Sequence, residues 1–291
     1  WQPPHPMPQC GWNPVAQPQK GLYLSVEKEK TEDFFSSDCC VFEYASAKLH
    51  IFLQISKFIC NFVPQNRHTM VLYFSGTGNS LAIARAIATA TNDQVLPLVQ
   101  AFRQDLTSEK RIGLVYPSYD FNAPPAVRKL VPMFRLNPQA YVFLIIPCGA
   151  QAGNSSWTIR RLLREKGIEV AYCHKIRVPD NSAIVFGRNP NDQKWKFSRF
   201  ANRLQTIIDD VRNERHAYHY SWWSLIAWIM GSERMQEWMI RTFRPAVNAD
   251  KCIGCGICAR VCPMRNISIE EKAGIGPHCT ACLACLHACP Q

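Results

Sequence analysis

Short apolar runs alternate with segments of helical periodicity between Met70 and Asp180. A continuous apolar run of about 4–8 residues is typical of a strand that is buried on both faces of a sheet. The expected strands are residues 70–74 (MVLYF), 94–99 (QVLPLV), 111–117 (RIGLVYP), 141–147 (YVFLIIP) and 168–179 (IEVAYCHKIRVP). Strands that alternate with helices at these spacings predict an α/β fold with a parallel, doubly wound sheet.

Three segments between these strands carry helix signals. Residues 79–90 have one apolar stripe, which we expect to face the sheet. The stripe consists of Leu81, Ala84, Ile87 and Ala88. Residues 123–134 have proline near their start, where a helix tolerates it. Residues 154–167 run from Asn154, a candidate N-cap, to Gly167, a candidate for the residue just past the helix end.

Residues 189–248 are predicted to form a helical bridge between the sheet and the C-terminal region. Residues 193–214 place their large apolar side chains roughly on one helix face, which fits packing across the edge of the sheet. The alternative interpretation is a docking patch for a partner, made of exposed tryptophans. Its residues are Trp222, Trp223 and Trp228.

Residues 1–69 differ from the rest of the chain. The first twenty residues are rich in Pro and Gln, a composition typical of loops or disorder. The following residues show neither turn-bounded strands nor a sustained helical period. We leave 1–69 unassigned, as a disordered appendage or as upstream read-through before a natural start at Met70.

Bulk composition narrows the function classes. Hydrophobic residues make up 47% of the chain, which is enough for a real core, and no apolar run reaches the roughly 18 residues of a membrane span. The formal net charge of +11 suits an acidic partner, a membrane surface or nucleic acid. A basic nucleic-acid binder with structural metal clusters is the least favoured interpretation, because the chain lacks a recognisable nucleic-acid recognition module.

Two cysteine runs near the C-terminus repeat one pattern. The first is Cys252-x₂-Cys255-x₂-Cys258-x₃-Cys262-Pro263, and the second is Cys279-x₂-Cys282-x₂-Cys285-x₃-Cys289-Pro290. Three equally spaced thiolates on one tight turn can reach three irons of a cube, and the fourth cysteine begins a helix that leads away. Zinc sites also use C-x₂-C pairs, but they rarely need three equal spacings followed by proline, repeated once. Cysteines that bunch at metal-ligand spacing favour a reducing, cytoplasmic setting over a disulfide framework.

These runs closely resemble bacterial two-cluster ferredoxins. The resemblance implies two 4Fe–4S clusters in a small α+β domain over residues 249–291. It assigns Cys252, Cys255, Cys258 and Cys289 to one cluster, and Cys279, Cys282, Cys285 and Cys262 to the other. The first copy continues as MRNISIEE, a short β segment, whereas only Gln291 follows Pro290. We therefore expect the sequence to be truncated at its C-terminus.

The loop after the first strand reads SGTGNS, from Ser75 to Ser80. A loop between a strand and a helix offers backbone N–H groups and the positive helix end to a phosphate. No Lys follows Gly78, as a P-loop would require, and no third glycine completes a dinucleotide fingerprint. What remains is a hydroxyl-rich loop that suits a phosphate monoester held by neutral donors.

This loop, together with the five-strand pattern, closely resembles flavodoxin over about residues 70–180, and we expect the flavodoxin-like FMN domain to span residues 70–188. The resemblance implies a five-stranded sheet in the order 2-1-3-4-5, with FMN at the carboxyl ends of the strands. The implied cofactor-binding residues are Ser75, Gly76, Thr77, Gly78, Asn79 and Ser80 at the phosphate, and Tyr119, Cys148 and Gly149 near the ring. Phe121 is the alternative to Tyr119 as the aromatic that stacks on the ring.

A flavodoxin-like domain joined to a two-cluster ferredoxin resembles the flavodoxin–ferredoxin fusion proteins of anaerobes. The resemblance implies an electron-transfer protein that passes electrons between two 4Fe–4S clusters, FMN and a redox partner. The alternative is an FMN-dependent reductase of a small molecule that uses the clusters as an internal wire, with Tyr119 or Asp120 as proton donor. The sequence leaves open the donor, the acceptor, the direction of flow and the oligomeric state.

Overall fold

The computed structural model describes residues 69–180, 194–218 and 229–291. The expectations for the N-terminal segment, apart from residue 69, and for the three tryptophans at 222, 223 and 228 lie outside the described residues. Within the described ranges, no helix combines the length and the apolar character that a membrane crossing requires.

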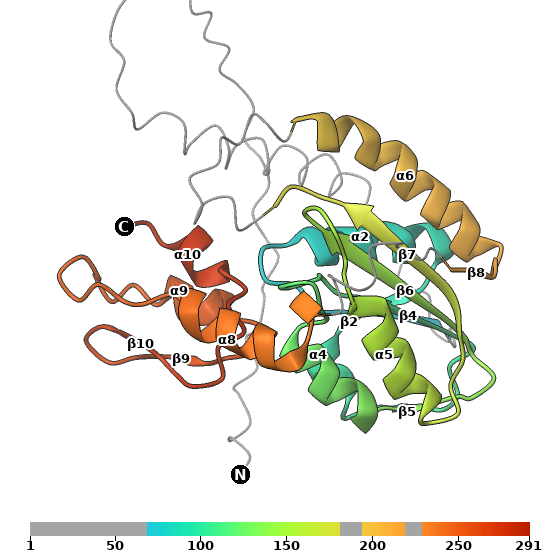
Figure 1. Ribbon diagram of the computed structural model, residues 1–291, viewed down its shortest axis with the longest axis horizontal. Helices are drawn as coiled ribbons and strands as arrows, with labels where there is room; N and C mark the ends of the chain where they lie inside the picture. The colour runs from blue at the N-terminus through green and yellow to red at the C-terminus, as the bar shows by residue number, and fades with distance from the viewer. Residues whose placement is uncertain (1–68, 181–193, 219–228) are drawn as a thin grey trace, which may run out of the picture. The chain divides into compact units, whose positions relative to one another are not determined.

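A parallel six-stranded sheet forms the core of the described chain (Figure 1). Its strands are β1 (Thr69–Tyr73), β2 (Gln94–Pro97), β4 (Arg111–Val115), β6 (Tyr141–Cys148), β7 (Val170–Arg177) and β8 (Ala217–Tyr218). The strand order is β2-β1-β4-β6-β7-β8. The first five strands therefore follow the order 2-1-3-4-5 that the sequence predicted, which is the flavodoxin-like arrangement.

The prediction of five strands was wrong by one, because β8 extends the sheet at its far edge. β8 pairs in parallel with β7, in the register Tyr172 with Ala217 and Cys173 with Tyr218. A two-residue strand has no apolar run or alternation that could reveal it in the sequence. Its position is set by the edge of β7, which is a long-range relationship.

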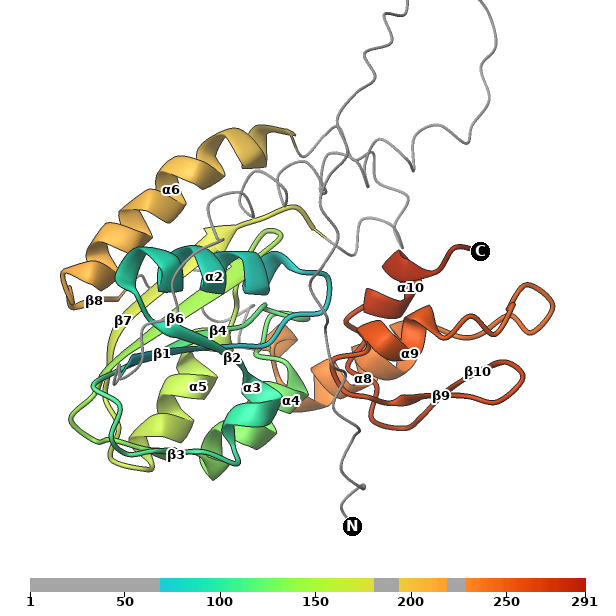
Figure 2. The same ribbon diagram turned by 180° about the vertical axis from the view of Figure 1, so that it is seen from behind.

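Helices cover both faces of the sheet. On one face lie α2 (Asn79–Thr91) and α6 (Lys194–Arg212), as Figure 2 shows from behind. The other face carries α4 (Pro125–Leu130), the short 3-10 helix η1 (Val131–Met133) and α5 (Ser155–Arg164), with α3 (Leu98–Ala101) beside them. A small separate pair of parallel strands joins β3 (Asp105–Leu106) to β5 (Arg135–Leu136). Three layers of this kind bury the sheet on both sides, which explains its continuous apolar strands.

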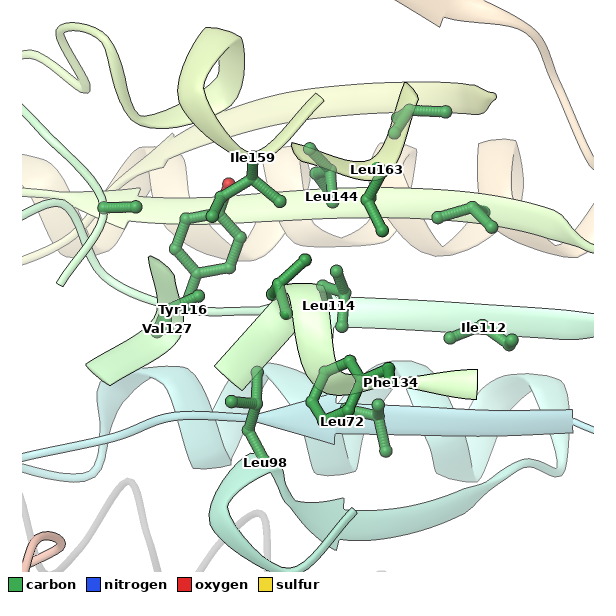
Figure 3. Close-up of a cluster of buried hydrophobic side chains, with 14 of the residues drawn as sticks. Leu72, Leu98, Ile112, Leu114, Tyr116, Val127, Phe134, Leu144, Ile159 and Leu163 are labelled. Carbon is green, nitrogen blue, oxygen red and sulfur yellow. The ribbon is translucent and has the colours of Figure 1, made fainter. Parts of the chain in front are cut away.

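Alternate strand residues divide the core between the two faces. Leu72, Leu114 and Leu144 pack with Ile159 and Leu163 of α5 (Figure 3). Their neighbours along the strands point to the opposite face. This second cluster contains Val71, Val115, Phe143 and Ile145, with Ile83 and Ile87 of α2 and Ile207, Ile208 and Val211 of α6.

The apolar stripe of α2 differs by one residue from the expected one. Ile83, Ala84, Ile87 and Ala88 are buried, whereas Leu81 is only partly buried. The buried set follows an i, i+1, i+4, i+5 pattern, which marks a single face at 3.6 residues per turn. Leu81 lies at the margin of that face.

Residues 189–248 contain more than helices. The buried residues of α6 belong to the core of the sheet, and β8 is a strand of it. The α-helix that precedes the cysteine runs along the chain is α8 (Glu233–Phe243), and Ser232 is its N-cap residue. The Ser232 hydroxyl accepts a hydrogen bond from the Met235 backbone N–H at 3.3 Å, as expected of an N-cap.

The C-terminal segment repeats its local structure as well as its sequence. Each run contains one short helix, α9 (Ile257–Val261) or α10 (Ala284–Ala288). The helix starts after the second cysteine of the run, contains the third and ends one residue before the fourth. Between the runs, β9 (Ile267–Ile269) and β10 (Ala273–Ile275) form an antiparallel pair. β9 coincides with the β segment expected after the first run.

Candidate functional site

The two cysteine runs adopt nearly the same backbone conformation. Gly254 and Gly256 have φ angles of 66° and 72°, and Ala281 and Leu283, each 27 positions later, have 50° and 60°. Left-handed conformations are easy for glycine but cost other residues roughly 1–2 kcal/mol each. A non-glycine pair that keeps the same turn indicates that the surroundings impose it, which is common at functional sites.

The first candidate metal centre is a small cavity between the two runs. Four cysteines line it: Cys262, Cys279, Cys282 and Cys285. Cys262 comes from the first run and the other three from the second, as in the set that the ferredoxin resemblance implied for one cluster. The backbone N–H groups of Ala281 and Asn266 donate to the sulfurs of Cys279 and Cys262, each at 3.4 Å. Such N–H···S bonds stabilise thiolates and tune clusters bound to them.

The four thiols line a cavity and are not gathered around a single metal position. Within the ranges that the structure describes, no three His, Cys, Asp or Glu side chains come close enough together to hold a single metal ion. A cluster needs this more open arrangement, because each thiolate binds a different iron. Burial raises the pKa of the Cys282 thiol to about 11, so the positive charge of iron is what would keep this buried sulfur deprotonated.

The second candidate metal centre involves Cys252, Cys255, Cys258 and Cys289. The backbone N–H of Ala273 donates to the Cys252 sulfur at 3.5 Å. This hydrogen bond and a second one from the Gly254 backbone hold the pKa of the Cys252 thiol below its usual value. Cys255 and Cys289 are exposed. Thiolate-favouring hydrogen bonds at an exposed site fit a cluster near the protein surface.

The predicted loop Ser75–Ser80 lies between β1 and α2, and its last two residues, Asn79 and Ser80, form the start of α2. The Gly78 backbone N–H donates to the Ser75 hydroxyl at 3.1 Å, and Gly78 has a φ of 98°, which only glycine adopts easily. The first turn of α2 contains no acidic residue. Free N–H groups at a helix start and nearby hydroxyls suit a phosphate dianion.

A cavity of about 420 Å³ opens at the carboxyl ends of the strands, next to this loop. This is a size and position at which parallel α/β sheets bind cofactors. Of the nine cofactor-binding residues expected from the sequence, Gly78 is the one that does not line the cavity. The other eight do, namely Ser75, Gly76, Thr77, Asn79, Ser80, Tyr119, Cys148 and Gly149.

Sequence reasoning missed several residues of the cavity wall. Asp180 follows β7 and lies against Gly149, where an added Cβ would be 2.8 Å from the Asp180 carboxyl carbon. The rule that ligands bind beyond the carboxyl ends of strands, applied to β7, points to Asp180. Further missed residues come from α8 and the second cysteine run. They are Met239, Phe243, Ala281, Cys282 and Leu283.

Two carboxylates, Asp120 and Asp180, line the cavity. Among the described residues of its wall there is no Lys, Arg or His, although the whole chain is strongly basic. Burial raises the pKa of the Asp120 carboxyl above its usual value. A second anion beside a bound phosphate cofactor would meet no cation among the described lining residues.

The Tyr119 hydroxyl reaches the phosphate loop, where it would lie 2.9 Å from a Cβ atom added to Gly76. The Gly76 backbone N–H donates to this hydroxyl, and burial, together with Cys282 and Asp120 nearby, raises the pKa of this hydroxyl well above its usual value. Phe121, the alternative aromatic, lines the same cavity and is more exposed. Both aromatics are therefore placed beside the space where a flavin ring was expected.

Helix α8 holds the loop that carries Tyr119. Gln236 is fully buried, and its side-chain amide donates to the backbone carbonyls of Tyr119 at 2.8 Å and Ala123 at 3.2 Å. Its carbonyl oxygen accepts from the Arg128 guanidinium at 2.8 Å. The Asn122 amide donates to the Gly231 carbonyl at 2.7 Å, just before α8. These bonds connect the loop to the chain segment that leads to the cysteines.

Comparison with known proteins supports the interpretation of the C-terminal segment. Residues 244–290 match the family model of the 4Fe-4S dicluster domain. The chain carries a 4Fe-4S dicluster domain at its C-terminus. The pyruvate synthase subunit PorD of Methanocaldococcus jannaschii is 36% identical over 53 residues, which are 17% of this chain and 62% of that protein. The chain thus spans under two thirds of the curated relative that it matches.

Solved structures similar to the chain include flavoproteins. A two-electron reduced flavodoxin from Megasphaera elsdenii is 20% identical, with 40% of this chain and 90% of that chain covered and a TM-score of 0.33. A putative flavoprotein from Bacteroides uniformis is 13% identical, with 41% and 96% covered and a TM-score of 0.33. Because these scores are low, the flavodoxin-like assignment rests on the observed strand order and the position of the first loop.

Proposed function

We propose that this protein binds FMN in the 420 Å³ cavity and two 4Fe–4S clusters on its eight C-terminal cysteines, and that it carries electrons between them. The match to a dicluster domain supports electron transfer with a redox partner as the function of the C-terminal segment. The observation that supports the proposal for the whole chain is that one cavity is lined by both the phosphate loop and the second cysteine run. Cys282, a cluster ligand by its spacing, lines the same cavity as the phosphate loop.

The donor set of the cavity fits FMN. Thr77, Asn79 and Ser80 supply neutral hydrogen-bonding side chains at the start of α2, where a phosphate monoester gains from the helix end. Gly149 and Tyr119 bound the space beyond the loop, where a planar ring would lie. FMN supplies a carrier of one or two electrons when bound. The residues of this chain bind the phosphate, position the ring and shield it from water.

The charge of the cavity favours a carrier over a reductase driven by a dinucleotide. A nicotinamide dinucleotide brings further phosphates, and the described residues that line the cavity include two carboxylates and no cation to receive them. Electrons that arrive through the clusters need no such contact. In a reducing, cytoplasmic setting, the covalent link between the two domains would let electrons pass between clusters and flavin within one chain, without a diffusional encounter.

A reductase of a small neutral molecule is the second candidate. The specific observation in its favour is Asp120, a carboxyl at the cavity with a raised pKa, which suits a proton donor. Such a protein would release a reduced product, whereas a carrier would only exchange electrons.

Rapid mixing of the reconstituted protein with a low-potential donor tests the proposal. We expect the flavin absorbance near 450 nm to fall after the clusters are reduced, with a first-order rate that does not change on dilution. A rate that scales with protein concentration would indicate transfer between molecules and would contradict the proposal. Consumption of one compound from a panel of small oxidants, with product release, would favour the reductase.

A further inference from the structure

The two cysteine runs have similar backbone conformations but differ in solvent exposure. Ile253 lies between the first two cysteines of its run and is 63% exposed, whereas Thr280, at the equivalent position 27 residues later, is 5% exposed. Cys255 is exposed, whereas its equivalent Cys282 is partly buried and lies against Gly76. Because the local structure is the same, the difference comes from what packs against each run.

The flavodoxin-like part covers the second run. A Cβ atom added to Gly76 would be 2.8 Å from the Cβ of Cys282 and 2.9 Å from its carbonyl oxygen, so the phosphate loop touches this cysteine. The cavity wall continues from Cys282 to Ala281 and Leu283. Met239 and Phe243 of α8 line the same cavity.

The other implied ligand set consists of Cys252, Cys255, Cys258 and Cys289, and it differs in exposure. Cys255 and Cys289, which come from different runs but belong to the same implied cluster, are both exposed. None of Cys252, Cys255, Cys258 and Cys289 lines the cofactor cavity. One ligand set therefore adjoins the cavity through Cys282, whereas the other set has two exposed cysteines and none at the cavity.

We propose that the site of Cys262, Cys279, Cys282 and Cys285 holds the inner cluster, which exchanges electrons with the flavin, and that the site of Cys252, Cys255, Cys258 and Cys289 holds the outer cluster, which meets the redox partner. This order rests on the proposed function. Electron tunnelling weakens steeply with distance, so the covered site is the one coupled to the cavity. Each transfer moves one electron, which oxidises the donor site and reduces the acceptor site by one; the external redox protein supplies or accepts that electron.

A matched pair of variants tests the order. Cys258 and Cys285 are 27 positions apart, and each is the second residue of its helix, α9 or α10. Cys258→Ala and Cys285→Ala should each retain about four irons per chain. We expect Cys285→Ala to weaken FMN binding about tenfold, because the wall at Ala281–Leu283 loses the cluster that organises it, while Cys258→Ala changes FMN affinity less than about twofold. Equal losses, or the larger loss in Cys258→Ala, would overturn the order.

Intact protein provides a second measurement that needs no variant. A soluble paramagnetic chromium complex should broaden the EPR signal of one reduced cluster much more than the other. The protected signal should be the one whose shape changes when FMN is removed. Equal broadening of both signals would contradict the order. Wild-type protein that binds no FMN would contradict the proposed function itself, whereas FMN binding with equal losses in the two variants would contradict only the cluster order.

Discussion

Gly76 of the phosphate loop and Cys282 of the second cysteine run lie in direct contact. A Cβ atom at position 76 would be 2.8 Å from the Cβ of Cys282, and real Cβ atoms essentially never approach so closely. The two residues are far apart in the sequence and belong to segments with different candidate cofactors. Their contact places an implied cluster ligand beside an implied phosphate site.

Gly76→Ala should push these two segments apart. The obstruction includes the Cys282 backbone and the Tyr119 hydroxyl, so a side-chain rotation cannot relieve it. Overpacking of this kind costs about 1–3 kcal/mol. We expect a lower free energy of unfolding and slower flavin reduction through the clusters, measured by denaturant unfolding and rapid mixing. Thr77→Ser, one residue along, is the control and should change neither. An unaltered rate in Gly76→Ala would show that the contact is not needed for transfer.

Thr77→Val should weaken the binding of FMN and spare riboflavin. The substitution removes a hydroxyl that lines the cavity at the phosphate loop and keeps the side-chain shape. A hydrogen bond to a charged group contributes about 1.5–3 kcal/mol, which corresponds to roughly 10–100-fold in affinity. Fluorescence titration with both ligands measures the difference. Equal weakening for FMN and riboflavin would place the phosphate elsewhere.

Asp120→Asn should stabilise the protein at pH 7. Burial raises the folded-state pKa of Asp120 above 3.8, so the folded protein favours the protonated carboxyl. The resulting cost is present when pH exceeds the folded pKa and disappears as pH falls below 3.8. Asn also tolerates the φ of 48° at this position. Thermal unfolding should therefore show a higher Tm for the variant at pH 7 and equal values below pH 3.8. A lower Tm at pH 7 would mean that the Asp120 charge is stabilising.

Gln236→Met should loosen the loop that carries Tyr119. Met keeps the length and the packing but removes three hydrogen bonds, and it leaves the carbonyls of Tyr119 and Ala123 buried without this donor. We expect FMN affinity to fall about tenfold and the visible circular dichroism of the bound flavin to change. The control is Glu237→Met, the same replacement at an exposed neighbour on α8. If Gln236→Met leaves both the FMN affinity and the flavin spectrum unchanged, Gln236 has no role in FMN binding.

The sequence predicted those features that depend on local pattern. Four of the five main strands were recognisable from largely buried apolar runs, whereas the edge strand β2 is only partly buried. The cysteine runs were recognisable because ligand spacing is local. The loop Ser75–Ser80 was recognisable because hydroxyls and glycines stand between a strand and a helix. β8 was missed because two residues carry no periodicity, and only its pairing with β7 defines it.

Long-range relationships were not predictable from pattern. Gln236 is one polar residue on an amphipathic helix, and nothing in its neighbours shows that its amide will be buried against Tyr119 and Ala123. The contact between Gly76 and Cys282 depends on how two segments pack, which neither motif encodes. These contacts are the ones that bring the two candidate cofactor sites together.

The central claim is that one polypeptide holds two iron–sulfur clusters beside a flavin, and cofactor content tests it most directly. The full chain should be purified and reconstituted without oxygen, and its iron, sulfide and flavin should then be counted per chain. We predict about eight irons, about eight sulfides and one FMN, with cluster and flavin bands in the visible spectrum. A colourless protein, or one that carries zinc in place of iron, would contradict the account.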